Sequence, residues 1–260
     1  MDGTDMIVSV AQAQMFFLAL VRILAMIVSL PMLGGNNIPL QVRVGVGFTL
    51  TMVLVPWQKP LPADAETMSA FVMGMGIVKE MFIGILMGFS AVLAFGAVQV
   101  AANFMGLNTG FAAGQILNPT FGSSGSAYDS MYLIICTIFF LAIDGHLMFI
   151  KAMALTFNVI PVNSPLPAFS VEPLIRITST LIRSGVQLAL PVIAAVVMTD
   201  ITSGLLARVA PQIQVFFLAI NVKILLSLVA VVLAFSITLP WLRDIFQQIA
   251  PRSLMLIGVQ

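Results

Sequence analysis

Six apolar segments dominate the sequence. A helix that crosses a bilayer needs roughly 20 mainly apolar residues, and each segment is about that long or longer. They cover residues 11–33, 38–57, 68–102, 127–159, 173–199 and 212–239. Around residues 56–66, three prolines and three charges mark the clearest exposed loop. The pattern predicts an all-α membrane protein with about six long apolar helices, some of them broken or hairpin-like.

The composition supports a membrane setting and narrows the function classes. Hydrophobic residues make up 60% of the chain and charged residues 8%, whereas soluble domains carry about 25% charged residues. Lipid or partner subunits must therefore cover much of the surface. The net charge of +1 argues against nucleic acid as a partner. One cysteine and one histidine argue against a disulfide within the chain, a metal site or a catalytic triad, so we expect no cofactor.

Both ends of the chain carry local signals. The acidic start Met1–Asp5 lacks the basic region of a signal peptide, so we expect no cleavage. Near the other end, residues 200–211 predict a break between the fifth and sixth segments, because Pro211 should end a helix. Residues 240–260 mix charges with large apolar side chains and predict an amphipathic helix at the membrane interface.

The third segment, residues 68–102, is too long for a simple span. As one helix it would measure about 50 Å, against roughly 30 Å for the hydrocarbon core. It must either bend or extend beyond the bilayer. Gly84, Gly88 and Gly96 lie on one face of this helix, which is typical of closely packed membrane helices.

Several charged or titratable residues lie within or at the edges of the apolar segments. We single out Arg22, Arg43, Glu80, Asp144, His146, Asp200 and Arg208. A charge facing lipid is costly, so these residues should be enclosed. One interpretation is a proton relay or substrate path, and the other is ion pairing that holds helices and subunits together. The scattered positions favour the second. Asp144 and His146 do not share a helix face, so the two residues alone do not form an acid–base pair. We expect them to belong to a packed hydrogen-bonding cluster instead.

A glycine-rich stretch, residues 106–125, differs in composition from the apolar segments on either side of it. Irregular backbone cannot face lipid, so this stretch must be a surface loop or must line an enclosed cavity. Composition alone favours a surface loop. Five large apolar side chains in the stretch point the other way, toward a re-entrant loop or a pore constriction: Leu107, Phe111, Ile116, Leu117 and Phe121.

An ordered set of residues along nearly the whole chain stands at characteristic spacings. It comprises Arg22, Pro31, Ile38, Pro39, Val42, Arg43, Glu80, Gly84, Gly88, Gln99, Gly106, Gly110, Asn118, Pro119, Phe139, Asp144, Gly145, His146, Asp200, Gly204, Leu205, Arg208, Pro211, Gln212 and Asn221. In this set the chain resembles the FliR family, the R subunits of the flagellar type III export gate, whose injectisome relatives are the SpaR, YscT and EscT proteins.

The resemblance implies an assembly and a location. An R subunit combines with P-type and Q-type subunits in a helical hetero-oligomeric gate, and a B-type export switch protein associates with it. The gate lies in the bacterial inner membrane, within the flagellar basal body. The chain would be one subunit, with a P-like part at about residues 1–200 and a Q-like hairpin with an amphipathic tail at about residues 201–260.

The resemblance also implies a plug loop that closes the channel, and residues 106–125 match it by position. The residues implied for the plug are Gly106, Leu107, Asn108, Gly110, Phe111, Gly114, Gln115, Ile116, Leu117, Pro119 and Phe121.

The resulting hypothesis is a non-enzymatic subunit that forms and plugs the channel for unfolded flagellar proteins. The alternative is a secondary transporter of a small solute or ion, favoured by helix breaks around Pro119 and Pro211 and by intramembrane charges. An intramembrane enzyme is disfavoured, because no catalytic spacing surrounds the single histidine.

Overall fold

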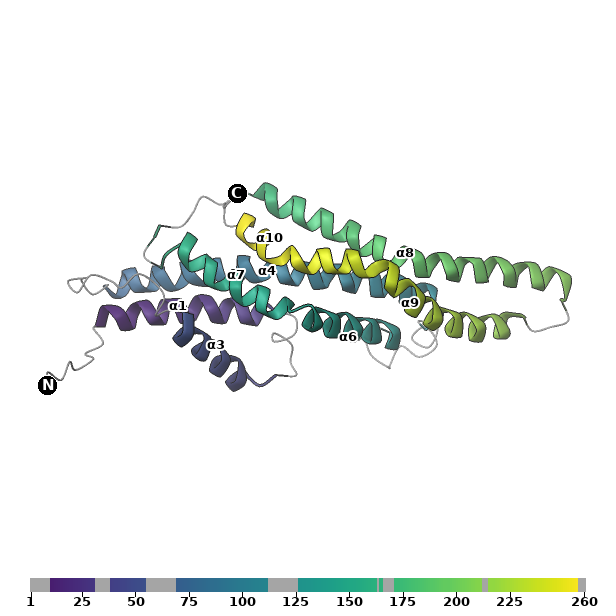
Figure 1. The fold of residues 1–260 in the computed structure, drawn as a ribbon, viewed down its shortest axis with the longest axis horizontal. Coiled ribbons are helices and arrows are strands. Elements are labelled where there is room, and N and C mark those ends of the chain that lie inside the picture. Colours follow the sequence, from purple (N-terminus) through teal and green to yellow (C-terminus); the bar gives the residue numbers. More distant parts are fainter. Residues whose placement is uncertain are drawn as a thin grey trace. The chain divides into compact units, whose positions relative to one another are not determined.

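The computed structural model describes residues 10–30, 38–54, 69–111, 126–162, 164–165, 171–211 and 215–256, with the backbone alone for residues 215–217. All regular elements within these residues are helices (Figure 1): α1 Val10–Ser29, α3 Leu40–Leu54, α4 Ala70–Asn108, α6 Ala127–Ala142, α7 Gly145–Val159, α8 Val171–Val209, α9 Val215–Gln247 and α10 Ile249–Leu256. In the described residues, 4 helices are long and apolar enough to cross a membrane, or 5 if the bent pair of α6 and α7 is one broken span. The prediction of an all-α membrane protein is confirmed.

Contacts divide the chain into two compact units. The first contains α1, α3, α7, α10 and α4 up to Val92, together with the start of α8 up to Ile175. The second contains α6, α9, the remainder of α4 and α8 from Arg176 onward. Each unit has its own buried side chains, and the two are described separately below.

In the first unit, one face of α1 is buried, and α3 packs against α1 (Figure 1). Leu18, Ile23 and Met26 of α1 are fully enclosed. The Phe16 ring meets the Phe48 ring of α3 edge to face, with 5.6 Å between centroids. By contrast, α3 buries only Gly47 and Thr51 along its length, so most of this apolar helix is left uncovered by the described chain.

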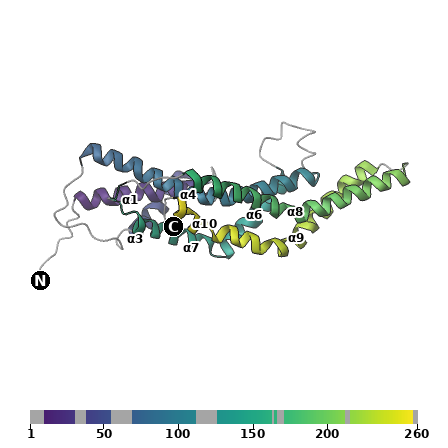
Figure 2. The ribbon, with the colours of Figure 1, turned by 90° about the horizontal axis from the view of Figure 1, so that it is seen from above.

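In the second unit, three phenylalanine rings hold three helices together. Phe95 of α4 lies 5.3 Å from Phe140 of α6 and 5.2 Å from Phe246 of α9, and the last two rings are 5.0 Å apart. Aromatic pairs at these separations add about 0.5–1.5 kcal/mol each beyond the burial of their area. Farther along the same unit, α8 and α9 run side by side as a hairpin in both views (Figures 1 and 2).

The third apolar segment forms a helix longer than predicted. Helix α4 is an unbroken 39-residue helix that ends at Asn108 rather than near residue 102. Its length of about 58 Å exceeds the roughly 30 Å hydrocarbon core. The first three residues of the glycine-rich stretch are therefore helical, because the backbone bonds of α4 continue until Thr109 N–H donates to Met105 O.

The fourth apolar segment is two helices rather than one. Helix α6 stops at Ala142, and α7 starts at Gly145. Asp144 between them has a φ of 59°, which breaks a right-handed helix and which aspartate tolerates better than most residues. A Cβ on Gly145 would strike the Phe140 ring, whose Cζ would lie 2.9 Å away, so this break requires glycine next to it.

The predicted break at residues 200–211 is wrong over most of its length. Helix α8 continues through Asp200, Gly204 and Arg208 to Val209, and Pro211 follows after one further residue. A single glycine costs a helix only about 1 kcal/mol, and Thr202 Oγ1 donates to Met198 O of the preceding turn. The helix ends where the residue before a proline disfavours helical dihedrals.

The predicted start of a separate tail helix at Pro240 is also wrong. Helix α9 runs through Pro240 to Gln247, and the short α10 follows. A proline inside a helix removes one backbone bond. The turns beyond it are retained because Leu242, Ile245 and Phe246 are buried in the protein, which outweighs the lost bond.

Candidate functional site

A buried ionic cluster joins three helices of the first unit. Arg22 of α1 donates from Nε to Glu80 Oε2 of α4, and both side chains are fully buried. Lys79 Nζ lies 3.0 Å from Glu80 Oε1. One carboxylate thus pairs with two neighbouring cations. Sequence reasoning placed Arg22 and Glu80 among the enclosed charges, and the structure brings these two together.

Arg22 also holds the end of α7, and Lys79 holds the segment that follows this helix. Arg22 Nη1 donates to Ile160 O at 2.8 Å and to Thr156 O at 3.3 Å. Its guanidinium carbon lies 4.5 Å from the centroid of the Phe157 ring, a cation–π geometry. Lys79 Nζ donates to Val162 O at 2.5 Å and to Ser164 O at 2.8 Å.

These contacts explain why the charges are stable there. The last carbonyls of a helix lack partners within the helix and carry partial negative charge, so cations satisfy them well. The cluster fixes the positions of α1, α4 and the end of α7 relative to one another. Lys79 directly precedes Glu80 in the sequence and brings a second cation to the cluster.

The other singled-out charges lie at the surface of the chain or near it. Asp144 and His146 are both exposed at the break between α6 and α7 in the described chain, so the packed cluster that we expected stays a prediction. Arg208 is exposed on α8, and Arg43 is half-buried on α3. Asp200 is 53% exposed and its Oδ1 lies 2.7 Å from Lys223 Nζ, which ties α8 to α9.

The glycines of α4 differ in what they face. A Cβ on Gly84 would lie 2.5 Å from Arg22 O and 2.7 Å from Ala25 Cβ of α1. A Cβ on Gly88 would lie 2.9 Å from Ser29 Oγ and 3.1 Å from Met26 O. These two glycines therefore let the backbones of α1 and α4 approach closely. Gly96 has open space, since no described heavy atom would lie within 4 Å of its Cβ.

The described start of the predicted plug runs from the end of α4 to Phe111. Gly106 is buried, Leu107 is 70% exposed, and Asn108 Nδ2 donates to Phe104 O in the preceding turn. Gly110 has a φ of 86° and lies against Ile220, Lys223 and Ile224 of α9. The Phe111 ring contacts the Tyr128 ring of α6, with 5.4 Å between centroids.

The remaining predicted plug residues lie outside the described residues: Gly114, Gln115, Ile116, Leu117, Pro119 and Phe121. The chain is described again from Ser126, which caps α6. Ser126 Oγ accepts from Asp129 N–H, and the Asp129 carboxylate accepts from Ser126 N–H, so the two residues form a capping box. The Ser–x–x–Asp spacing was a sequence signal for this helix start, which our sequence analysis did not use.

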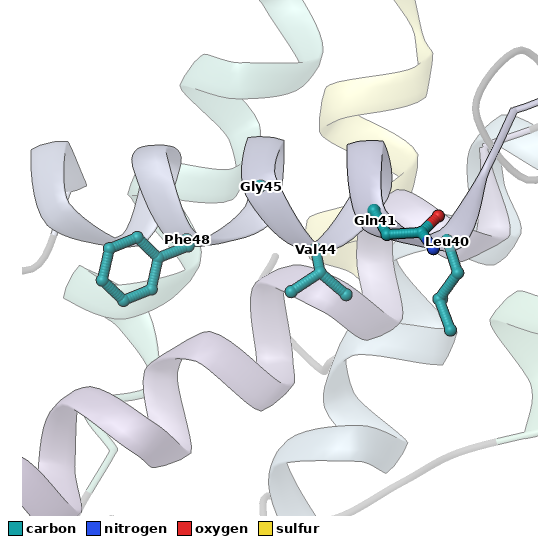
Figure 3. A pocket seen from close by; sticks show the side chains of 5 residues that line it. All are labelled: Leu40, Gln41, Val44, Gly45 and Phe48. Atoms are coloured by element: carbon teal, nitrogen blue, oxygen red, sulfur yellow. The ribbon is translucent and has the colours of Figure 1, made fainter.

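The described part of α3 carries a shallow apolar groove of about 500 Å³ (Figure 3). The Leu40, Val44 and Phe48 side chains lie on one side of the helix, and Gln41 supplies the polar amide of the lining. Such a lining suits hydrocarbon or apolar side chains rather than a polar substrate. Within the described residues no group of three His, Cys, Asp or Glu side chains is placed to hold a metal ion.

Comparison with known proteins agrees with these features. The family model of the bacterial export proteins, family 1, matches residues 13–249. The flagellar biosynthetic protein FliR of Pectobacterium carotovorum is 28% identical over 249 residues, which cover 95% of this chain and 93% of that protein. The FliR proteins of Escherichia coli and Bacillus subtilis are 27% and 26% identical, and each alignment covers about 90% of both chains. The chain therefore belongs to family 1 of the bacterial export proteins, with relatives that include flagellar FliR proteins of similar length.

Proposed function

We propose that the chain is a non-enzymatic core subunit of the flagellar protein export gate, which forms and plugs a channel for unfolded flagellar proteins. The observation that carries the proposal is the match to FliR proteins over nearly the full length of both chains. The gate would lie in the bacterial inner membrane, within the flagellar basal body. Its partners would be P-type and Q-type subunits and a B-type switch protein.

The exposed apolar surface supports a subunit that is covered by lipid and by other chains. Of the most apolar window in residues 218–256, only 28% is buried within the described chain. Large apolar side chains such as Val232, Leu225 and Met198 are each about two-thirds exposed or more. Patches of this kind mark membrane or protein contact surfaces. Within the gate, the part up to about residue 200 would be P-like and residues 201–260 Q-like.

The plug is proposed for residues 106–125. Support comes from the ends of the segment: Gly110 and Phe111 pack against α9 and α6, and Ser126 is fixed as a helix cap. Both ends of the segment are thus held by helices of one unit. Large apolar side chains between them would form a deformable seal, and the glycines would give the backbone freedom to move aside.

Ion permeability of the assembled gate tests the plug. We expect deletion of residues 110–115 to make membranes that contain the assembled gate leak small ions. Replacement of the same six residues by a Gly-Ser sequence of equal length is the matched control for chain length, and it should leak as well because the apolar seal is lost. Unchanged permeability in both variants, at equal amounts of assembled gate, would refute the plug assignment.

The mass of the gently extracted complex tests the assembly and separates it from the transporter alternative. A large hetero-oligomer that contains one copy of this chain is the expected result. A monomer or homodimer with coupled uptake of a small solute would instead establish a secondary transporter. The break at Asp144 is compatible with either architecture, so the mass measurement decides between them.

A further inference from the structure

Gly106, near the end of α4, is pressed against the start of α6. A Cβ at this position would lie 2.8 Å from Ser126 Oγ and 3.2 Å from Asp129 Cγ, and closer still to Asp129 Oδ1. Ser126 is 4% and Asp129 6% exposed. The polar start of α6 therefore lies in direct contact with the backbone of α4 at Gly106.

The capping box cannot move away from a side chain at position 106. Ser126 N–H donates to Asp129 Oδ2 at 2.9 Å, Ser126 Oγ–H donates to Asp129 Oδ1 at 2.8 Å, and Asp129 N–H donates to Ser126 Oγ at 3.2 Å. Any shift of the carboxylate breaks these bonds and leaves buried polar groups without partners, which is costly in an apolar setting. Position 106 thus accepts only glycine while the box is intact.

Further contacts tie the same two chain ends together. Thr109 is fully buried, and its Oγ1 donates to Gly106 O at 3.2 Å. Tyr128 of α6 contacts Phe111 through its ring, and its hydroxyl lies 4.0 Å from Met105 Sδ. The first residues of the proposed plug and the residues just after it are therefore held together.

We propose that Gly106, Ser126 and Asp129 form an anchor that sets the position of the plug by fixing both of its ends. Gly106 is then a positioning residue rather than part of the seal. The anchor rests on the proposed function, since it matters only if the segment between Phe111 and Ser126 closes a channel. Its components all lie in α4 and at the start of α6.

Gly106→Ala in the full-length chain within the assembled gate tests the anchor, with Gly96→Ala as the matched control. Both positions are glycines of α4, but no described heavy atom would lie within 4 Å of a Cβ at Gly96. We expect Gly106→Ala to raise ion leak several-fold per assembled gate and Gly96→Ala to leave it at the wild-type level. Equal leak in the two variants would overturn the anchor.

Two further variants separate positioning from simple crowding. Ser126→Ala removes the cap without adding volume at position 106, so it should also raise leak, and it keeps the proposal testable if Gly106→Ala does not assemble. Asp129→Ala makes room for an added methyl group but breaks the box. The double variant Gly106→Ala with Asp129→Ala should therefore leak as much as Asp129→Ala alone. A double variant that seals normally would overturn the anchor, because it would show that only crowding mattered.

The outcomes also distinguish the anchor from the plug. If deletion of residues 110–115 causes leak but Gly106→Ala and Ser126→Ala do not, the anchor is wrong and the plug stands. If the deletion causes no leak, the proposed function itself fails. In every comparison, the ion leak is divided by the amount of assembled gate, which is measured by copurification of the partner subunits. A variant that is only unstable lowers the amount of gate without raising the leak per gate.

Discussion

Glu80→Gln removes the only negative charge from the Arg22–Lys79–Glu80 cluster while it keeps the size of the side chain. Arg22 and Lys79 would then remain next to each other without a neutralising carboxylate. Breaking a buried ion pair by removing one partner costs about 3–5 kcal/mol. Because Arg22 and Glu80 are fully buried, solvent screening does not reduce this figure appreciably.

Such a loss corresponds to about two to four powers of ten in the unfolding equilibrium. For a chain of this size it would lower the midpoint of thermal unfolding by about 6–20 °C, at roughly 2–4 °C per kcal/mol. Thermal unfolding of the purified protein in mild detergent, followed by circular dichroism, is the assay. Proteolysis at the end of α7 should rise in parallel, because Arg22 holds carbonyls at this end and Lys79 holds carbonyls just beyond it.

Asp200→Asn is the matched control, since it also removes one carboxylate from an ion pair. Asp200 is 53% exposed and Lys223 20% exposed, and exposed pairs contribute only about 0–1 kcal/mol. The expected loss is therefore several times smaller than for Glu80→Gln. If both variants lose the same stability, or if Glu80→Gln loses none, the reasoning from burial is wrong.

Four substitutions test the packing, each by thermal unfolding against the wild-type chain. Gly84→Ala should destabilise the protein by about 1–3 kcal/mol through overpacking against α1, because its Cβ would lie 2.5 Å from Arg22 O. Gly96→Ala should be neutral or stabilise the protein slightly, since glycine lowers helix stability. A larger loss of stability for Gly96→Ala than for Gly84→Ala would contradict the assigned α1–α4 contact. Gly110→Ala should cost about 1–2 kcal/mol, since its φ of 86° strains any residue with a Cβ, and an unchanged midpoint would refute that backbone conformation. Phe246→Ala should cost about 3–5 kcal/mol by emptying the space between Phe95 and Phe140, and a loss below about 1 kcal/mol would show that these rings do not form a core.

The sequence predicted the main helical segments correctly but not where they end. Hydropathy located α1, α3 and the bodies of α4, α8 and α9, because a membrane helix is defined by a local run of apolar residues. It misjudged Pro240, which lies inside α9, and Asp144, which separates α6 from α7. In both places tertiary packing accompanies the local structure: Phe246, which follows the proline in α9, packs against Phe95 and Phe140, and Phe140 lies against Gly145.

The candidate site was predictable in part. Charges inside apolar segments must be enclosed, which singled out Arg22 and Glu80. Asp144 and His146 are exposed in the described chain, so their enclosure stays a prediction for the assembled state. The capping box of Ser126 and Asp129 was readable from its spacing. The contact between this box and Gly106 could not be predicted from the sequence, because no local pattern indicates which backbone lies against the start of a helix.

The sequence by itself therefore determined the class of the protein, its helical composition and its family resemblance, since all three depend on residue types and their order along the chain. Only the tertiary structure decided which charges meet. Arg22 and Glu80 are 58 residues apart in the chain, and their pairing follows from the close approach of α1 and α4 at Gly84 and Gly88. The physical reason is that hydropathy is a property of single residues, whereas ion pairs and close backbone contacts depend on how helices pack.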